Sequence, residues 1–575
     1  MQPGRSTGRS VPALPSFESN GRTTLVAGVL AVAAALFFAA PAPAQKPAAP
    51  AVSHGKVGVA TENRIATEAA MAELRAGGNA VDAAVTAALV GGIVSPTSSG
   101  LGGGGFALVR MADGSKPFFL DFREIAPAKV DAAALDERKI PPEQRGRLVG
   151  VPGEPAGLFA LHQRFGKRTW KDVVLRAERI ARGGFPVEKH LAAVLGQRNA
   201  EAFKRDAGLA SLYYPGGKPA IAGQLLKNPK LAGTLRRLAA EGPRAIYEGA
   251  IASDLVKVAE SAGGKLSLED LKAYAPRERE PLHVTWEGHD VYTAPPPSAG
   301  GLLVAQLLSL FSQRELEAYG LRTGLGIHYV AEAMRGAFAD RARFVGDPDA
   351  VPVDIARLLS PEHLGERKRR ISADRTHLRQ RFIPRESGTH HLIAVDASEN
   401  VVSLTTTVNT AFGAELTGTS SGIVLNDELD DFTATSVAAE LGITDNPNRA
   451  RANSRPVSSM TPTIVVKGGR PVLAIGGSGG PAIPMNVAQV LLARLAFGEA
   501  PDKAVSAPRF LLAPAEVTLR VDAGFSPAVL ADLAYRGELT KTLEYNPTAV
   551  QLVVMEPAGV LAAADPRKSG RGSVE

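Results

Sequence analysis

The stretch Glu386-Ser387-Gly388-Thr389-His390-His391-Leu392-Ile393-Ala394-Val395-Asp396 decides how this chain folds. A small glycine precedes a threonine, and the threonine begins an alternating, β-branched run that predicts a strand. A second run of this kind, residues 401–408, follows the polar turn 396–400, so the two runs predict a β-hairpin. If the register is symmetric about Ser398, Thr407 lies opposite Thr389, close enough for their hydroxyl groups to interact.

The Gly388-Thr389 junction suggests a chain that cuts itself. A threonine hydroxyl needs a base, and the free α-amine of an N-terminal threonine, with a reference pKa just below 8, can serve as one. An internal Thr389 has no such amine, so cleavage would create the catalyst. Its Oγ can attack the Gly388 carbonyl, shift the acyl group from N to O, and leave an ester that water hydrolyses. The alternative is a Gly-Thr pair that merely begins a strand.

A competing nucleophile stands in Gly476-Gly477-Ser478-Gly479-Gly480, which fits G-x-S-x-G between a predicted strand and a predicted helix. That elbow needs a histidine later in the chain, and the last histidine is His391. The serine-hydrolase reading therefore fails. The glycines remain useful, because a Gly-Gly turn at a helix N-terminus directs backbone N–H groups outward, as an oxyanion hole requires.

Several other chemistries are disfavoured. The absence of cysteine excludes disulfides, thiolate metal sites and cysteine nucleophiles. The glycine run 100–106 precedes a strand and lacks the Lys-Ser/Thr of a phosphate loop, so we expect a packed turn under a substrate site. His390 and His391 should point to opposite faces of a strand, and we expect no metal and no cofactor. The basic cluster 366–370 is broken by an acid and reads as a solvated helix face, so we expect no nucleic-acid partner.

The N-terminus has the layout of a secretory signal. Three arginines precede an apolar stretch from Leu25 to Ala40, and Ala42-Pro43-Ala44 offers a small-x-small cleavage site before Gln45. A retained membrane anchor is the alternative, but the apolar run is shorter than the roughly 20 residues that a spanning helix needs. We expect residues 1–44 to be removed and the mature protein to be periplasmic or secreted.

The rest of the chain alternates helical and strand patterns. We expect helices at 66–74, 80–90, 156–164, 171–181, 230–241, 251–262, 302–310, 329–344 and 486–497, within a mostly helical region 150–340. We expect further strands at 107–111, 118–122, 422–426, 463–467 and 471–475. Residues 433–454 lack periodicity and suggest a mobile loop, and residues 361–388 suggest an exposed segment that can unthread once cut. Arg123 ends a strand, where it could simply pair with Glu124 on the surface.

Several long motifs carry a family resemblance. They are Gly77-Gly78-Asn79-Ala80-Val81-Asp82-Ala83-Ala84, Asp121-Phe122-Arg123-Glu124 with Ala126-Pro127, Pro295-Pro296-Pro297-Ser298, Asp430-Asp431-Phe432, Arg455-Pro456-Val457-Ser458-Ser459-Met460 with Pro462, and Asp565-Pro566-Arg567. With them the chain resembles the γ-glutamyltransferase family from about residue 54 to 567. The resemblance implies an α+β fold, the four-layer αββα sandwich of N-terminal nucleophile hydrolases. It also implies one composite domain made of a large subunit, 45–388, and a small catalytic subunit, 389–575.

The resemblance assigns roles by position. Thr389 matches the nucleophile, Thr407 the threonine that supports it, and Gly479 with Gly480 the oxyanion hole. The substrate α-carboxylate would be held by Arg123, suited to bidentate pairing, with Ser458 and Ser459. The α-ammonium group would be held by Asn409, Glu428 and Asp431.

The implied activity is cleavage of the γ-glutamyl amide of glutathione and related compounds. A γ-glutamyl-threonine ester would pass its acyl group to water or to an amino acid or peptide. Alternatives are a related amidase for a cephalosporin side chain or poly-γ-glutamate, and an inactive, unprocessed binding protein. The chain departs from the family at His390, often Thr or Ala, and at Ser478, where proline is common in bacterial members. It also has no aromatic residue between Thr433 and Ser454, so we expect a more open site.

Overall fold

The computed structural model describes residues 54–136, 140–197, 203, 205–377, 388–512 and 517–575. All of these residues belong to one compact unit. The predicted signal 1–44 and residues 378–387 of the predicted exposed segment 361–388 lie outside the described residues. Among the described residues, no helix combines the length and apolar character needed to cross a membrane.

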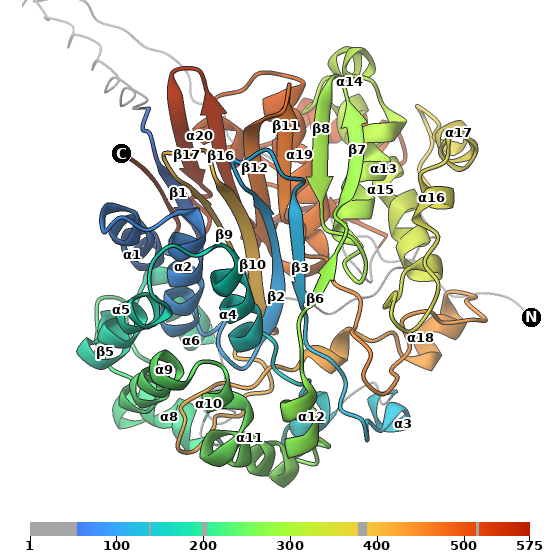
Figure 1. The fold of residues 1–575 in the computed structure, drawn as a ribbon. Coiled ribbons are helices and arrows are strands. Elements are labelled where there is room, and N and C mark those ends of the chain that lie inside the picture. Colours follow the sequence, from blue (N-terminus) through green and yellow to red (C-terminus); the bar gives the residue numbers. More distant parts are fainter. Residues whose placement is uncertain (1–53, 137–139, 198–202, 204, 378–387, 513–516) are drawn as a thin grey trace, which may run out of the picture. The chain divides into compact units, whose positions relative to one another are not determined.

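Two β-sheets form the centre of the fold (Figure 1). The first has the order β18-β1-β9-β10-β2-β3-β6, and its strands are β1 (Gly58–Thr61), β2 (Gly104–Arg110), β3 (Phe118–Phe122), β6 (Arg277–Arg279), β9 (Gly388–Val395), β10 (Val401–Asn409) and β18 (Arg571–Val574). The second has the order β17-β16-β12-β11-β8-β7, with β7 (Leu282–Trp286), β8 (His289–Thr293), β11 (Thr463–Lys467), β12 (Arg470–Ser478), β16 (Ala549–Glu556) and β17 (Gly559–Ala564). Every neighbouring pair in both sheets for which a register is defined is antiparallel.

Helices cover the outer faces of both sheets. The first sheet is covered by α1 (Arg64–Arg75), α2 (Ala80–Val94) and α4 (Glu154–Phe165), with α5 (Trp170–Gly183) packed on α2. The second is covered by α13 (Gly300–Leu310) and α19 (Ile483–Leu495), with α15 (Gly324–Phe344) packed on α13. Apolar side chains fill two large clusters, one under the first helix layer and one that joins the two sheets to the second layer. The predicted αββα sandwich is therefore confirmed.

Shorter elements surround the sandwich. They are α3 (Ala132–Leu135), α6 (Lys189–Gln197), α8 (Ala207–Tyr213), α9 (Pro229–Glu241), α10 (Arg244–Tyr247), α11 (Gly249–Ser261), α12 (Leu268–Ala273), α14 (Gln313–Tyr319), α16 (Ile355–Leu358), α17 (Pro361–Arg370), α18 (Thr435–Glu440), α20 (Pro501–Ser506), α21 (Pro527–Tyr535), the 3-10 turns η1 (Pro142–Leu148), η2 (Pro215–Gly217), η3 (Glu428–Asp431) and η4 (Gly480–Ala482), and the strands β4 (Phe185–Pro186), β5 (Leu225–Leu226), β13 (Phe510–Leu512), β14 (Leu519–Asp522) and β15 (Thr540–Leu543).

Most predicted elements are present, and the exceptions have local causes. The strand predicted at 422–426 is wrong, because this segment makes only isolated bridges, at Val424 and Leu425. The loop predicted at 433–454 contains α18, and Asn448 anchors it by donating to the carbonyl oxygen of Asp431 at 2.8 Å. The mostly helical region 150–340 also holds β6, β7 and β8, whose partly exposed residues hide the strand pattern.

The glycine run also differs from the expected turn. Its last two glycines, Gly104 and Gly105, begin strand β2 instead of preceding it. A Cβ on Gly105 would lie 2.1 Å from the carbonyl oxygen of Thr405, so these glycines let neighbouring backbones approach closely.

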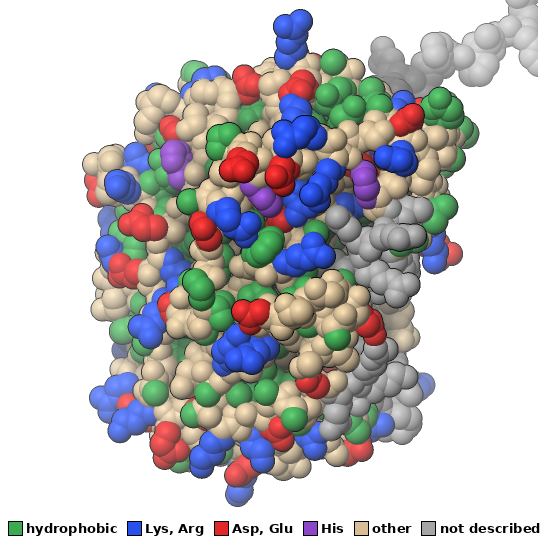
Figure 2. Space-filling view, turned by 90° about the vertical axis from the view of Figure 1, so that its right-hand side faces the viewer, with side chains coloured by type: hydrophobic (Ala, Val, Ile, Leu, Met, Phe, Trp, Pro, Cys, Tyr) green, Lys and Arg blue, Asp and Glu red, His purple; other side chains and the backbone are tan. Residues whose placement is uncertain are grey.

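The basic cluster 366–370 does lie on a helix, the last turn of α17. Lys368 pairs there with Glu315 at 2.7 Å, and Arg367 contacts the buried Asp340. On the face of the molecule shown in Figure 2, Lys and Arg side chains are interspersed with Asp and Glu. This face therefore presents a mixed charge rather than a basic surface.

Candidate active site

Strands β9 and β10 bring Thr389 and Thr407 together. They form a directly opposed antiparallel pair, as the symmetric hairpin predicted. Thr407 Oγ1 donates a hydrogen bond to the carbonyl oxygen of Gly388 at 2.5 Å and accepts one from the backbone N–H of Asn409 at 2.8 Å. A β-bulge between Thr407 and Asn409 makes this turn of the backbone possible. A hydroxyl donor thus lies on the carbonyl of the bond predicted to be cut, where it can stabilise negative charge on that oxygen.

The side chains of β9 alternate between two environments. Leu392 and Ala394 pack under the helices, whereas Ile393 and Val395 pack between the sheets. Thr389 shares the inner face with the latter pair. The nucleophile predicted from the sequence therefore lies between the two sheets, where it is 3% exposed.

The two histidines after Thr389 lie on opposite faces, as predicted. His390 packs on Gly91 of α2, and His391 packs on Gly476 of β12 and contacts the Thr405 hydroxyl at 2.8 Å. Burial lowers the pKa of His390 to about 4 and that of His391 to about 3, so both are neutral near pH 7. Within the described residues, no cluster of three or more His, Asp or Glu side chains could hold a metal ion.

Gly479 and Gly480 follow the last residue of β12, Ser478, and lead through η4 into α19. Both have positive φ angles, +118° and +61°. A Cβ on Gly479 would lie 2.6 Å from Thr548 Cγ2, so both backbone conformation and space require glycine there. Strand β12 packs against β9 and β10, which brings this turn to the same inter-sheet layer as Thr389. Its position beside a helix N-terminus suits a group that binds an oxyanion.

Arg123 forms the centre of a buried charged cluster. Its guanidinium contacts the carboxylate of Glu428 and that of Asp431, the latter at 2.5 Å. The alternative of a surface pair with Glu124 is wrong, because Arg123 is 1% exposed, Glu124 is fully buried and their charged atoms are 4.0 Å apart. Tyr274 fixes the local backbone by donating to the carbonyl oxygen of Arg123 at 2.9 Å.

Two acids of this cluster, Glu124 and Glu428, are shifted towards their protonated forms. Burial raises the pKa of Glu124 to about 8, although Arg123 opposes the shift. Burial also raises the pKa of Glu428 well above its usual value, again opposed by Arg123. Arg123 can still serve the carboxylate end of a zwitterionic head group as a cation, and the carboxyl oxygens can serve its ammonium end as hydrogen-bond acceptors.

The remaining predicted substrate contacts are also buried. Ser459 Oγ accepts a hydrogen bond from Arg341 of α15, and Ser458 Oγ accepts one from the Met460 N–H at 3.1 Å. Asn409 Nδ2 donates to the carbonyl oxygen of Asp427 at 3.0 Å. Asn409 Oδ1 is buried and has no hydrogen-bond partner among the described residues, so it can accept a bond from a ligand N–H group.

Sheet order links the two halves of the site. Gly104 of β2 lies directly opposite Thr407, and a Cβ on Gly104 would lie 2.6 Å from Glu124 Oε2. The order β9-β10-β2-β3 therefore places the threonine pair and the Arg123 cluster along the same end of one sheet. Sequence reasoning missed Arg341, Glu62 and Lys568, which also lie here. Only Lys568 had a signal, since it follows Asp565-Pro566-Arg567.

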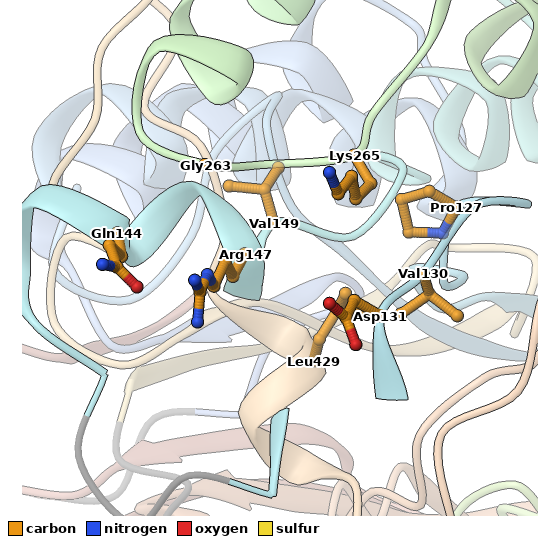
Figure 3. Close-up of a pocket in the computed structure, with 9 residues that line it drawn as sticks. All are labelled: Pro127, Val130, Asp131, Gln144, Arg147, Val149, Gly263, Lys265 and Leu429. Carbon is orange, nitrogen blue, oxygen red and sulfur yellow. The ribbon is translucent and has the colours of Figure 1, made fainter. Parts of the chain in front are cut away.

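A separate cavity of about 280 Å³ lies beside η3. Leu429 lines it, whereas its neighbours Glu428 and Asp431 contact Arg123. Figure 3 shows the side chains of Arg147, Lys265 and Leu429 around this cavity. None of the site residues predicted from the sequence lines it.

Comparison with known proteins now adds to this geometry. The sequence profile of the family described as Gamma-glutamyltranspeptidase matches residues 66–574. The chain belongs to the γ-glutamyltranspeptidase family. Glutathione hydrolase 2 of Arabidopsis thaliana is 38% identical over 458 residues, which cover 76% of this chain and 77% of that protein.

Two further comparisons show how far the likeness extends. The glutathione hydrolase proenzyme of Escherichia coli K12 is 33% identical and covers 94% of this chain and 97% of its own. A solved cephalosporin acylase from Bacillus halodurans matches with a TM-score of 0.81 and 26% identity, over 93% of this chain and 99% of its own. The γ-glutamyltranspeptidase fold thus accounts for nearly the whole chain, as the resemblance implied.

Proposed function

We propose that this chain is a precursor that cuts itself between Gly388 and Thr389 and then cleaves the γ-glutamyl amide of glutathione and related compounds. The observation that carries the proposal is the contact of the Thr407 hydroxyl with the Gly388 carbonyl oxygen, within the pair that Thr389 forms with Thr407. Family membership and relatives named glutathione hydrolase support the substrate.

Self-cleavage needs only groups of this site. Thr389 Oγ attacks the Gly388 carbonyl carbon while Thr407 stabilises the charge on the carbonyl oxygen. The bond from that carbon to the Thr389 nitrogen breaks, and the nitrogen takes the proton that Oγ gives up. Water then hydrolyses the ester, which leaves the Gly388 carboxylate and a Thr389 with a free α-amine and hydroxyl. The products are a large subunit, 45–388, and a small subunit, 389–575.

In the processed enzyme the α-amine takes the proton of Thr389 Oγ as the oxygen attacks the γ-glutamyl carbonyl. The Gly479 and Gly480 turn supplies N–H groups for the oxyanion. The amide bond breaks, its nitrogen leaves with a proton, and a γ-glutamyl-threonine ester remains. Water, or the amine of an amino acid or dipeptide, then takes the acyl group and restores Thr389. No cofactor takes part in these steps.

The Arg123 cluster holds the glutamyl head group. Arg123 pairs with the α-carboxylate, helped by the hydroxyls of Ser458 and Ser459. Asn409 Oδ1, Glu428 and Asp431 accept hydrogen bonds from the α-ammonium group. Because Glu428 and Asp431 contact Arg123 in this structure, a bound glutamyl group replaces part of that pairing with its own charges.

Mass spectrometry of the purified protein tests the proposal. We expect a fragment that begins at Thr389, a single intact chain in Thr389→Ala, and slowed but detectable cleavage in Thr389→Ser, which keeps a hydroxyl. Glutathione hydrolysis should require the cleaved form. An intact chain that hydrolyses glutathione would refute the proposal. N-terminal analysis of exported protein tests removal of residues 1–44, with Gln45 expected at the new end.

A second candidate is an amidase for another acyl group. The likeness to the Bacillus halodurans cephalosporin acylase favours it. Rates on glutathione, a glutaryl amide and poly-γ-glutamate, measured side by side, separate the candidates. A glutaryl amide lacks the α-ammonium group, so a preference for it would argue against the proposed roles of Asn409, Glu428 and Asp431.

A further inference from the structure

The first residues of β9, which include Thr389, have a neighbouring strand on one edge only. Strand β1 pairs with β9 only as far as Thr61 opposite Leu392. Beyond Thr61 the chain turns away, and Asn63 caps α1. Residues 389–391 therefore have no partner in β1, and their backbone groups on that edge need partners from side chains.

Two buried side chains take the place of the missing strand. The His391 N–H donates to Glu62 Oε1 at 3.0 Å, and Lys568 Nζ donates to Glu62 Oε2 at 2.8 Å. The same Nζ lies 3.5 Å from the Thr389 carbonyl oxygen and donates to Ser478 Oγ at 2.6 Å. The side chains of Lys568 and Glu62 are 5% and 3% exposed. Lys568 thus joins the nucleophile's own backbone to the residue before Gly479.

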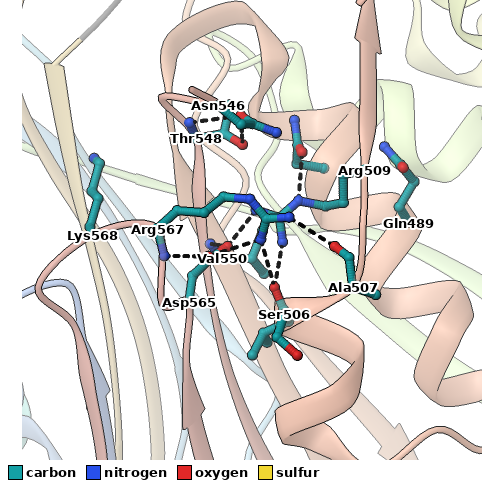
Figure 4. Close-up of polar contacts among 12 residues, drawn as sticks. Gln489, Ser506, Ala507, Arg509, Asn546, Thr548, Val550, Asp565, Arg567 and Lys568 are labelled. Atoms are coloured by element: carbon teal, nitrogen blue, oxygen red, sulfur yellow. Dashed lines mark hydrogen bonds and ion pairs between the residues drawn. The ribbon is translucent and has the colours of Figure 1, made fainter. Parts of the chain in front are cut away.

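Lys568 directly follows the motif Asp565-Pro566-Arg567, whose charged side chains are held by hydrogen bonds and ion pairs. Asp565 contacts Arg509 and accepts from the Val550 N–H at 3.1 Å, and Arg567 donates to Asp522 at 2.6 Å. Figure 4 shows this cluster with Lys568 beside it. Val550 of β16 lies opposite Gly477 of β12, so the motif also fixes Lys568 relative to the strand that carries Ser478.

A Ser478–Lys568 catalytic dyad is disfavoured by the same contacts. A lysine can act as a base only when it is neutral. Lys568 Nζ donates hydrogen bonds to both Glu62 Oε2, at 2.8 Å, and Ser478 Oγ, at 2.6 Å, whereas a base would have to accept one from the serine hydroxyl. Lys568 therefore donates to Ser478 and does not take its proton.

The strand geometry also places the future α-amine near Lys568. In a β-strand the N–H and C=O groups of one residue point to the same edge, and successive residues alternate between edges. The Gly388 carbonyl points to β10, where it meets Thr407, so the nitrogen and carbonyl of Thr389 both point to the opposite edge. That edge is the one on which Lys568 lies.

We propose that Lys568 is a positioning residue for Thr389, which fixes the nucleophile relative to the Gly479 turn and keeps its new α-amine in the free-base form. The inference rests on the proposed role of Thr389. A neighbouring positive charge disfavours protonation of an amine, and the amine must be unprotonated to act as the base.

Other titratable groups surround this position. Burial lowers the pKa of His190 to about 4, and His390 and His391 are likewise neutral near pH 7. Burial raises the pKa of Tyr545, so it also stays neutral. The charges that act on the amine from these surroundings are therefore those of Lys568 and Glu62, and Lys568 contacts the Thr389 backbone itself.

The test compares Lys568→Met, Lys568→Arg and Ser478→Ala with wild type, with Lys467→Met as a control at an exposed lysine of the β11–β12 turn. The measurements are the pH profile of kcat/KM on a γ-glutamyl anilide, kcat and KM separately, and the rate of self-cleavage. In Lys568→Met we expect kcat to fall by about 10- to 100-fold with little change in KM. We expect the acidic limb of the profile to move up by about 0.5 to 1 pH unit.

Lys568→Arg should restore the position of the acidic limb, because it keeps the charge. Ser478→Ala should lower kcat without moving the limb, because it removes only the hydrogen bond. A wild-type profile and kcat in Lys568→Met would overturn the proposal, as would an arginine variant whose limb is shifted as far as that of the methionine variant.

Two safeguards keep the outcome interpretable. Lys568→Met leaves Glu62 buried without its cation, so the charge-neutral pair Glu62→Gln/Lys568→Met is tested as well, with its thermal unfolding compared with wild type. It should fold and still show the loss of kcat; a folded double variant with wild-type kcat would overturn the positioning role. If wild type cleaves itself but has no γ-glutamyl activity, the proposed function fails, whereas Lys568 is still judged by the rate of self-cleavage.

Discussion

The Thr407 hydroxyl donates to the carbonyl oxygen of Gly388 at 2.5 Å, across a hairpin whose two strands are joined only by residues 396–400. This contact lies on the bond that must break and not on a substrate. Thr407 Oγ1 also accepts a hydrogen bond from the Asn409 N–H, and this keeps the hydroxyl hydrogen of Thr407 directed at Gly388. Self-cleavage is thus prepared by the hairpin itself, before any substrate is present.

Replacing Thr407 by valine should slow self-cleavage by about 100-fold, since one hydrogen bond to the developing oxyanion is lost. Thr407→Ser keeps the hydroxyl and should cleave at a rate near that of wild type. Denaturing electrophoresis of freshly expressed protein over time gives both rates. Equal rates in the valine and serine variants would show that the hydroxyl is not needed.

Replacing Arg123 by lysine should raise KM for a γ-glutamyl substrate by about 30-fold or more, equivalent to about 2 kcal/mol. The charge is kept, but an ammonium group cannot pair in a bidentate way with the α-carboxylate and also contact the buried acids. Steady-state kinetics measure the effect. Arg470→Lys, at an exposed arginine paired with Glu399, is the matched control and should leave KM unchanged.

Gly479→Ala tests the proposed oxyanion turn. The new Cβ would lie 2.6 Å from Thr548 Cγ2 at a φ of +118°, so the turn must shift and kcat should fall by about 100-fold. Gly498→Ala provides the control, because Gly498 also has a positive φ, +63°, but open space around a Cβ. If both variants lose activity equally, backbone strain alone explains the loss.

The carboxyl group of Glu154, which is not one of the predicted substrate contacts, should make the stability of the protein depend on pH. Burial raises its pKa to about 8, so the folded protein keeps this proton while the unfolded chain loses it near its usual, lower pKa. Stability is therefore lost as pH rises between the unfolded and the folded pKa. Glu154→Gln should reduce the fall in Tm between pH 5.5 and 8.5 by several degrees. Glu362→Gln, on the surface of α17, should not.

Local patterns in the sequence were enough to predict the hairpin and its register. The turn 396–400 is polar, the flanking runs are β-branched, and their symmetry alone places Thr407 opposite Thr389. Strands β3 and β11 were predicted with their observed bounds for the same reason. By contrast, β7 has exposed residues at His283 and Thr285 and was missed, because an edge strand lacks a continuous apolar run.

The site was harder to complete from sequence, because its support comes from distant parts of the chain. Glu62 and Lys568 are 506 positions apart, and Arg341 and Ser459 are 118 apart. No spacing rule links such residues. The raised pKa of Glu124 is equally invisible in sequence, since it arises from burial that only the packed sheets create.

The strand order of the two sheets has one more consequence. In the first sheet β9 lies between β10 and β1, and β1 is also paired with β18; only β1 of these four precedes Gly388. In the second sheet β11, which follows Gly388, pairs with β8, which precedes Gly388. After a cut at Gly388 each sheet would still contain strands from both polypeptides. The two products could then come apart only by unfolding, so the pair would be permanent and would not exchange partners with other molecules. This shared strand order would form only if the precursor folds as a single chain before it is cut.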